Sequence, residues 1–336
     1  MRWRELGIMQ SNKSYRVGFG PMSLQVIDSL AEYSDKEHPL MIIASRNQVD
    51  YTGSYVMVTE ALKSRLSGTT NLMLCRDHCG PYFKDSDSGL SLEQALDECY
   101  KTIQTDIANG FELIHVDVSR IPNKKDRLPI AKKLIDRALD INPGVIFEFG
   151  TEENIGLASD QTGLIEQLDF LEQYRENVKY VVTQTGSLTK HTQVGKFDPI
   201  MVRKLSDIIH ARGFLLKEHN ADYLSSDQVA EHFSAGVDAM NVAPQLGVAQ
   251  THMTWMACRN AGLNKEWHDF VEVVISAGKW KKWLGLHACP GDEVLSAGHY
   301  HFNTEQYKKI LNSLDSGFGK QLNATIRDIC NTYCEI

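Results

Sequence analysis

Eight short apolar segments alternate with amphipathic segments along most of this chain, and this alternation constrains the fold more than any other feature. The apolar segments are rich in β-branched side chains, as expected for strands that are buried on both faces. They cover residues 16–20, 40–45, 71–76, 112–118, 145–150, 180–185, 214–218 and 239–243. Strands that alternate with helices form a parallel sheet through right-handed crossovers.

The segments between the apolar runs carry helix start and stop signals. Ser91 and Gln94 form a capping box in front of a stripe of apolar residues, and Gly110 ends that stripe. Asp198 followed by Pro199 predicts the start of a later helix, because aspartate caps a helix and proline suits its first position. The connections are therefore predicted to be helices.

Eight strand–helix units over roughly 250 residues match the size of a (β/α)8 TIM barrel. We predict that residues 1–262 form this α/β barrel and that residues 263–336 form a helical C-terminal extension packed on it. The competing fold is a doubly wound open sheet, which needs a glycine-rich phosphate turn after its first strand. Residues 18–20 match that turn only in part, and Pro21 lacks the amide N–H that the turn requires. The sequence therefore favours the barrel.

Composition excludes several classes of protein. The net charge of −8 argues against a nucleic-acid-binding surface. Seven cysteines without a CxxC pair indicate reduced thiols in the cytosol. The N-terminus lacks the apolar region of a signal peptide, and no apolar run approaches the ~20 residues that span a bilayer. We expect a soluble cytoplasmic protein that binds neither nucleic acid nor membrane.

Polar residues gather where the apolar segments end. In barrel enzymes, catalytic and binding groups come from the C-terminal ends of the strands. The candidate substrate-binding residues at these ends are Asn47, Gln48, Asp117, Ser119, Lys190 and Asn241. Three histidines, His78, His191 and His219, follow the third, sixth and seventh segments. Together they could form a zinc site with one open position, at which zinc acts as a Lewis acid on a substrate oxygen.

Five motifs occur in the order in which they occur in one known family. Residues 74–81 (Leu-Cys-Arg-Asp-His-Cys-Gly-Pro) resemble the Gly-Asp-His-Leu-Gly-Pro signature of the Z-type subunit of class II tagatose-bisphosphate aldolases. Residues 47–49, 114–119, 150–152 and 217–223 are similar to that family's second-, fourth-, fifth- and seventh-strand motifs. The resemblance extends from about residue 16 to 260.

The resemblance implies an aldolase that depends on zinc or another divalent metal and stabilises an enediolate. It assigns the metal to His78, His191 and His219. Asp77 would be the acid that exchanges a proton with the departing aldehyde oxygen. Glu152 would be a further acid/base group, and Asn241 would contact the enediolate.

The family's glycine-rich phosphate loop is replaced here by His-Asn-Ala-Asp at residues 219–222. Asp222 would repel a phosphate, so Lys190, Lys196 or Arg46 would have to hold it as point charges. Three functions stay open: a zinc-dependent aldolase acting on a ketose phosphate or related sugar, a non-catalytic accessory subunit that stabilises a separate aldolase subunit, and a metal-dependent sugar epimerase. The resemblance also implies a homo-oligomer.

Overall fold

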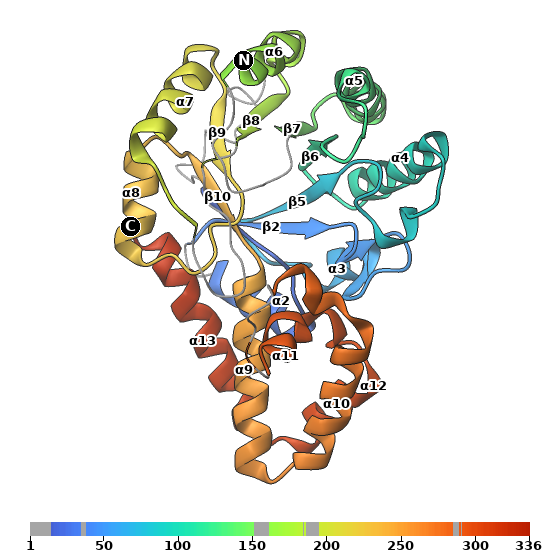
Figure 1. Cartoon of the computed structure of the whole chain (residues 1–336), viewed down its shortest axis with the longest axis vertical. Helices are drawn as coiled ribbons and strands as arrows, with labels where there is room; N and C mark the ends of the chain where they lie inside the picture. Colours follow the sequence, from blue (N-terminus) through green and yellow to red (C-terminus); the bar gives the residue numbers. More distant parts are fainter. Residues whose placement is uncertain are drawn as a thin grey trace.

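Eight parallel strands close into a barrel in the order β1-β10-β9-β8-β7-β6-β5-β2 (Figure 1). The computed structural model describes residues 15–34, 38–150, 161–183, 185, 195–284, 289 and 291–336. Each predicted apolar segment forms one barrel strand, so the predicted (β/α)8 barrel is confirmed. The strands are β1 Val17–Phe19, β2 Leu40–Ser45, β5 Leu72–Cys79, β6 Leu113–Asp117, β7 Ile146–Gly150, β8 Val178–Val182, β9 Leu215–Glu218 and β10 Ala239–Val242.

Helices follow the strands and cover the outside of the barrel. They are α2 Leu24–Ser34, α3 Thr59–Arg65, α4 Leu92–Ala108, α5 Lys124–Ile141, α6 Gln161–Leu171, α7 Pro199–Ala211, α8 Ser226–Ser234 and α9 Pro244–Ala261. Ser91 and Gln94 form the predicted capping box of α4, and the Asp198 carboxylate caps α7. A two-stranded sheet, β3 Val49–Asp50 with β4 Met57–Val58, was not predicted. Among the described helices, none has the length and apolar character needed to cross a membrane.

The interior of the barrel consists of an apolar layer and a polar layer. The apolar layer contains Met41, Ile43, Met73, Cys75, Leu113, Ile146, Tyr180 and Ala239. Side chains alternate between the two faces of a strand, so the residue two positions further along each strand also points inward. Those next positions hold Asp77, His115, Glu148 and Asn241 on four different strands. The C-terminal end of the barrel is therefore lined with groups that can do chemistry.

The C-terminal residues form helices that pack on the barrel and project from it (Figure 1). They are α10 Asn264–Ala277, α11 Asp292–Ala297, α12 Glu305–Ser313 and α13 Gly317–Cys334. A separate apolar core, which includes Phe270 and Tyr307, joins α10–α12 to the end of α9 through Cys258. Helix α13 returns to pack on α2, α8 and α9. The predicted domain boundary after residue 262 falls in the turn between α9 and α10.

Candidate metal centre

Strand β5 places Asp77 and His78 at the mouth of the barrel. The strand continues to Cys79, beyond its predicted end at residue 76, because its pairing with β2 extends to Asp77 opposite Ser45. Its pairing with β6 is irregular between Arg76 and Cys79, and His78 has a φ of +47°. A positive φ is uncommon for residues other than glycine, and such strain concentrates at functional sites. The irregularity lets two consecutive side chains reach the same cluster.

The close approach of β5 and β6 explains why a glycine, Gly80, stands two positions after His78 in the motif. A Cβ at Gly80 would lie 1.6 Å from the backbone oxygen of Asp117. No other residue therefore fits where the end of β5 approaches the end of β6. This close approach brings His78 Nδ1 to 2.6 Å from Asp117 Oδ2.

Asp77, His78, His115 and His219 come together in one cluster, in which one ligand atom of each lies within 4.8 Å of the others. The imidazole centroids are 5.0 Å apart for His78 and His115, 5.3 Å for His78 and His219, and 4.9 Å for His115 and His219. The structure thus brings together two of the predicted metal ligands, His78 and His219. The third, His191, lies outside the described residues.

One ring nitrogen of each imidazole lies near a carboxylate oxygen of Asp77. The distances to that carboxylate are 3.6 Å from His78 Nε2, 3.5 Å from His115 Nδ1 and 3.9 Å from His219 Nδ1. The other nitrogen of His78 is bound by Asp117, and that of His219 is bound by Glu148. A carboxylate on the far nitrogen fixes the orientation of metal-ligating histidines and raises their basicity. The arrangement therefore contains the carboxylates that orient metal-ligating histidines as well as the histidines themselves.

The cluster fits a divalent transition metal. Three imidazole nitrogens form a zinc donor set that leaves a fourth position open, and imidazoles that share one tetrahedral ion have centroids about 5 Å apart. Asp77 Oδ1 and His115 Nε2 are buried and have no hydrogen-bond partner among the residues that the structure describes. Buried polar atoms rarely lack a partner, which indicates that this cluster is built to hold a polar guest.

The charges of the cluster stabilise one another. Burial disfavours the Asp77 carboxylate, but His78, His115 and His219 outweigh this effect and hold its pKa well below the usual range. Burial also disfavours protonated His78, yet Asp77 and Asp117 raise its pKa to about 9. A metal ion that binds His78 has to displace the proton on its ring. Because its own pKa is low, Asp77 is ionised at neutral pH.

Glu148 and Lys217 form a buried ion pair beside the histidines. Lys217 Nζ lies 2.5 Å from Glu148 Oε2, and the two side chains are 0% and 2% exposed. Burial disfavours the Glu148 carboxylate, but Lys217, His219 and His115 outweigh this effect and hold its pKa well below the usual range.

Sequence reasoning missed the roles of His115, Glu148 and Lys217. His115 stands inside a quoted motif and was interpreted as part of a strand. The available signal was the alternation of Leu113, His115 and Asp117, which puts these three side chains on the inward face of β6.

Two predicted substrate-binding residues border the centre. Asp117 accepts hydrogen bonds from His78 and from the backbone N–H of Ser119. Asn241 points into the barrel, and its Oδ1 is buried without a partner in the part of the chain that the structure describes. A Cβ at Gly18 would lie 2.6 Å from that atom, so this glycine leaves room for the asparagine.

Asn47 and Gln48 form hydrogen bonds within the loops at the same end of the barrel. Gln48 Oε1 accepts the backbone N–H of Ser45 at 2.9 Å, and its side chain is buried. The Asn47 amide donates to the backbone oxygen of Phe83 and to Asp85. These contacts position loops, and a contact of either residue with substrate stays a prediction. Lys190 and Glu152 lie outside the described residues.

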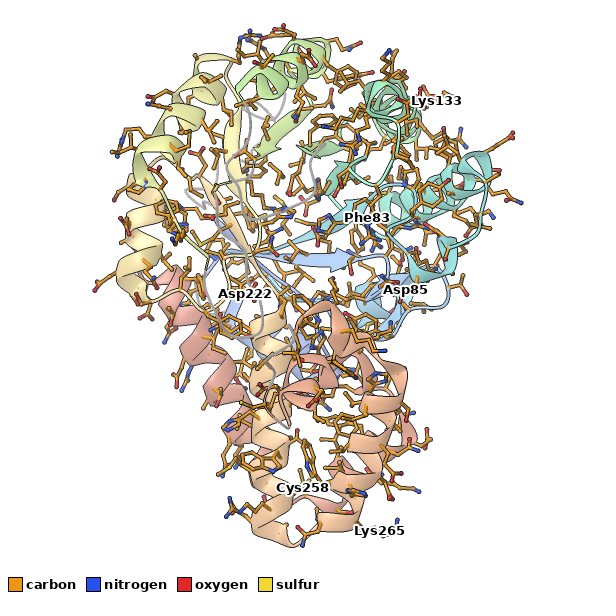
Figure 2. All side chains as sticks on the ribbon, viewed as in Figure 1. Phe83, Asp85, Lys133, Asp222, Cys258 and Lys265 are labelled. Atoms are coloured by element: carbon orange, nitrogen blue, oxygen red, sulfur yellow. The ribbon has the colours of Figure 1, made fainter. Side chains whose placement is uncertain are left out.

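The structure changes the interpretation of two charged residues. Arg46, one of the three alternatives for holding a phosphate, is fully buried and pairs with Asp87 at 2.7 Å and with Asp50 at 3.6 Å, so its charge is already neutralised inside the protein. Asp222 is also buried, and its carboxyl group accepts the backbone N–H groups of Ala243 and Gln245 at the start of α9. It therefore occupies the N-terminus of a helix instead of facing a substrate. Figure 2 shows it well apart from Phe83 and Asp85.

No family model matches the sequence. The fold is similar to that of a probable tagatose 6 phosphate kinase from Sinorhizobium meliloti 1021, with a TM-score of 0.76 and 18% identity over 95% of this chain and 94% of that one. It is also similar to fructuronate-tagaturonate epimerase UxaE from Cohnella laeviribosi, with a TM-score of 0.63 and 11% identity over 96% and 81% of the two chains. Fructose-bisphosphate aldolase from Campylobacter jejuni matches with a TM-score of 0.59 and 12% identity over 99% and 96%. At these identities the likeness shows a shared fold, and aldolases are among the barrels that share it.

Proposed function

We propose that this chain is a metal-dependent lyase of the class II aldolase type, which cleaves or forms a carbon–carbon bond in a ketose phosphate or related sugar. The observation that carries the proposal is the position of the Asp77 carboxylate, within 3.9 Å of a ring nitrogen from each of three histidines. The shared fold with a fructose-bisphosphate aldolase and the resemblance of residues 74–81 to the Z-type tagatose-bisphosphate aldolase subunit support it.

His78, His115 and His219 would hold the divalent ion, and His191 remains the further predicted ligand. A divalent ion bound there supplies Lewis acidity that draws electrons from a substrate carbonyl. The residues themselves position the ion, because Asp117 and Glu148 fix two of the imidazole rings.

Asp77 is the proposed acid/base group. In the cleavage direction its carboxylate accepts the proton of the hydroxyl group next to the bond that breaks. The oxygen then forms the aldehyde carbonyl, and the electron pair of the broken bond moves to the carbon beside the ketone. The low pKa of Asp77 keeps it in the ionised form that this step needs. Asn241, with its free buried Oδ1, is placed to contact a substrate hydroxyl.

A sugar epimerase is the second candidate. An epimerase moves protons with two acid/base groups, and this site has two carboxylates near one imidazole. Asp77 Oδ1 lies 3.5 Å from His115 Nδ1, and Glu148 Oε1 lies 3.8 Å from the same atom. The common fold with an epimerase is consistent with this candidate.

The test is turnover by the purified full chain loaded with zinc. Substrates would be fructose and tagatose bisphosphates, their monophosphates, and the hexuronates fructuronate and tagaturonate. Release of a triose or another aldehyde supports the lyase, whereas a change of configuration without cleavage supports the epimerase. Asp77→Asn should abolish turnover while the chain retains zinc.

A zinc-loaded chain that turns over none of these sugars would contradict both enzymatic proposals. Co-purification with a second aldolase-like chain that is active only in the complex would instead support the accessory role. The same purification, followed by light scattering, would test the predicted homo-oligomer.

A further inference from the structure

The loop after β5 places an aromatic ring on one of the histidines of the metal centre. The Phe83 ring lies against the imidazole of His78, with centroids 5.0 Å apart and planes only 6° from parallel. Figure 2 shows Phe83 and Asp85 on the side of the barrel that carries α4. The His78 side chain is 37% exposed, whereas those of His115 and His219 are 3% and 10% exposed. The orientation of His78 therefore depends more than theirs on a few individual contacts.

Two contacts on the His78 ring have different effects. Asp117 Oδ2 lies 2.6 Å from Nδ1, and this hydrogen bond fixes one atom of the ring. A stacked aromatic ring fixes the plane of the imidazole, because aromatic pairs prefer defined relative orientations. The Nε2 atom of His78 lies 3.6 Å from the Asp77 carboxylate, at the centre of the cluster. The stack with Phe83 thus helps to direct that nitrogen towards the position of a metal ion.

The backbone in front of Phe83 is fixed on both sides. Tyr82 has a φ of +70°, a conformation that residues other than glycine keep only where their surroundings hold them in it. Its N–H donates to Asp87 Oδ2 at 3.1 Å, and its backbone oxygen accepts Arg120 Nη1 at 2.6 Å. Asp87 is itself paired with the buried Arg46 at 2.7 Å. These contacts restrict where the Phe83 ring can lie.

Asn47 holds the same loop from the end of β2. Its Nδ2 donates to the backbone oxygen of Phe83 and to Asp85 Oδ1, both at 3.1 Å, and its Oδ1 accepts the N–H of Asp85 at 2.9 Å. A side-chain amide has two N–H groups, so both are used inside the protein. Lys279 Nζ of the C-terminal extension adds an ion pair to Asp85 Oδ2 at 2.7 Å. Asn47 therefore reaches the metal centre through the loop that it holds.

We propose that Phe83 is a positioning residue that orients the His78 imidazole for metal binding, and that Asn47 acts by holding Phe83 in place. Neither side chain would touch the ion or the reacting atoms. The proposal rests on the proposed function, because it takes the cluster as a metal centre. The role of Asn47 would then be indirect, through His78, and would need no contact of the amide with substrate.

The first test is the zinc affinity of the full chain, measured by chelator competition. Phe83→Leu and Asn47→Ala should each weaken zinc binding about two- to tenfold, the range expected for the loss of an aromatic pair. Phe83→Tyr keeps the ring and should keep the wild-type affinity. Phe170→Leu is the matched control, since Phe170 is also half-buried but packs on Phe149 and Tyr174 from α6. Equal affinity in the wild type, Phe83→Leu and Asn47→Ala would overturn the proposal.

A double variant tests whether Asn47 acts through Phe83. If it does, adding Asn47→Ala to Phe83→Leu should weaken zinc binding no further than Phe83→Leu alone. The KM for any sugar that the chain turns over should also stay at the Phe83→Leu value. Additive losses of zinc affinity, or a further rise in KM, would show that Asn47 acts independently and would overturn its assigned role.

The second test needs no metal and reads the position of the ring itself. In protein with 13C-labelled histidine, the His78 ring signals are identified by their loss in His78→Gln. Phe83→Leu and Asn47→Ala should both shift these signals in the metal-free chain, because the Phe83 ring current acts on them. The signals of His268, which is 73% exposed, serve as the control and should not move. Unmoved His78 signals in both variants would contradict the proposal.

The two tests together separate this proposal from the proposed function. Shifted His78 signals in a chain that neither holds zinc nor turns over sugars would leave the contact between Phe83 and His78 standing and remove the lyase. Zinc binding and sugar turnover that are the same in the wild type, Phe83→Leu and Asn47→Ala would leave the lyase standing and remove the positioning role.

Discussion

Replacing Lys217 by methionine should destabilise the protein strongly, because it leaves the Glu148 carboxylate buried without its main counter-charge. The two charged groups are 2.5 Å apart, and the side chains are 0% and 2% exposed. Removing one partner of such a pair typically costs about 3–5 kcal/mol of unfolding free energy. Lys132→Met is the control, since Lys132 pairs with Asp136 on the exposed surface of α5, and its loss should change the stability far less.

The assay is urea unfolding of the wild type and the variants with a chelator present, at about pH 4 and at pH 7. Without Lys217, burial should raise the pKa of Glu148 above its value in the unfolded chain. The folded variant would then hold a proton that the unfolded chain releases, so its stability falls as the pH rises. The cost of Lys217→Met should therefore be small at the lower pH and large at pH 7. Adding Glu148→Gln should recover most of the loss. A cost below about 1 kcal/mol at pH 7, or an equal cost at both pH values, would refute the reasoning.

Two further predictions concern Gly150 and Lys179. A Cβ at Gly150 would lie 3.2 Å from His115 Nε2, so Gly150→Ala should shift the imidazole and weaken zinc binding about tenfold in a chelator competition. Gly319→Ala, whose Cβ meets nothing within 4 Å, is the control, and equal zinc affinity in both variants would contradict the prediction. Burial lowers the pKa of Lys179 to about 8 from the ordinary 10.5. Between pH 8 and pH 10.5 the unfolded chain therefore holds a proton that the folded chain has lost. The stability of the folded protein should rise with pH over that range. In a pH series of urea unfolding, Lys179→Met should remove that rise and stabilise the protein at pH 7 by up to about 3 kcal/mol, and an unchanged pH profile would contradict this.

The barrel could be predicted because its signals are local. Each strand is an apolar run, each helix has its own caps, and eight such units leave few topologies. The positions of His78 and His219 followed from the same signal, since both come where an apolar run ends. Gly80 could be placed in a motif, but its reason is a contact with Asp117, 37 residues away from it in sequence.

The remaining parts of the site depend on contacts that a sequence does not display. A single histidine inside an apolar strand, such as His115, gains its role only when the register turns it inward beside two others. The pairing of Arg46 could not be anticipated because its partner Asp87 lies 41 residues later in the sequence. The contact between Lys279 of the C-terminal extension and Asp85 on the loop after β5 spans 194 residues, so it could not be anticipated.

The central claim is that the three histidines and Asp77 form a metal centre in which His115 is a ligand. The most direct test is the zinc content and zinc affinity of the wild-type chain, of His115→Ala and of His268→Ala, an exposed histidine that serves as the control. We predict close to one zinc per chain in the wild type and in the control, and an affinity at least about tenfold lower in His115→Ala. A folded His115→Ala chain that binds zinc as tightly as the wild type would contradict the account.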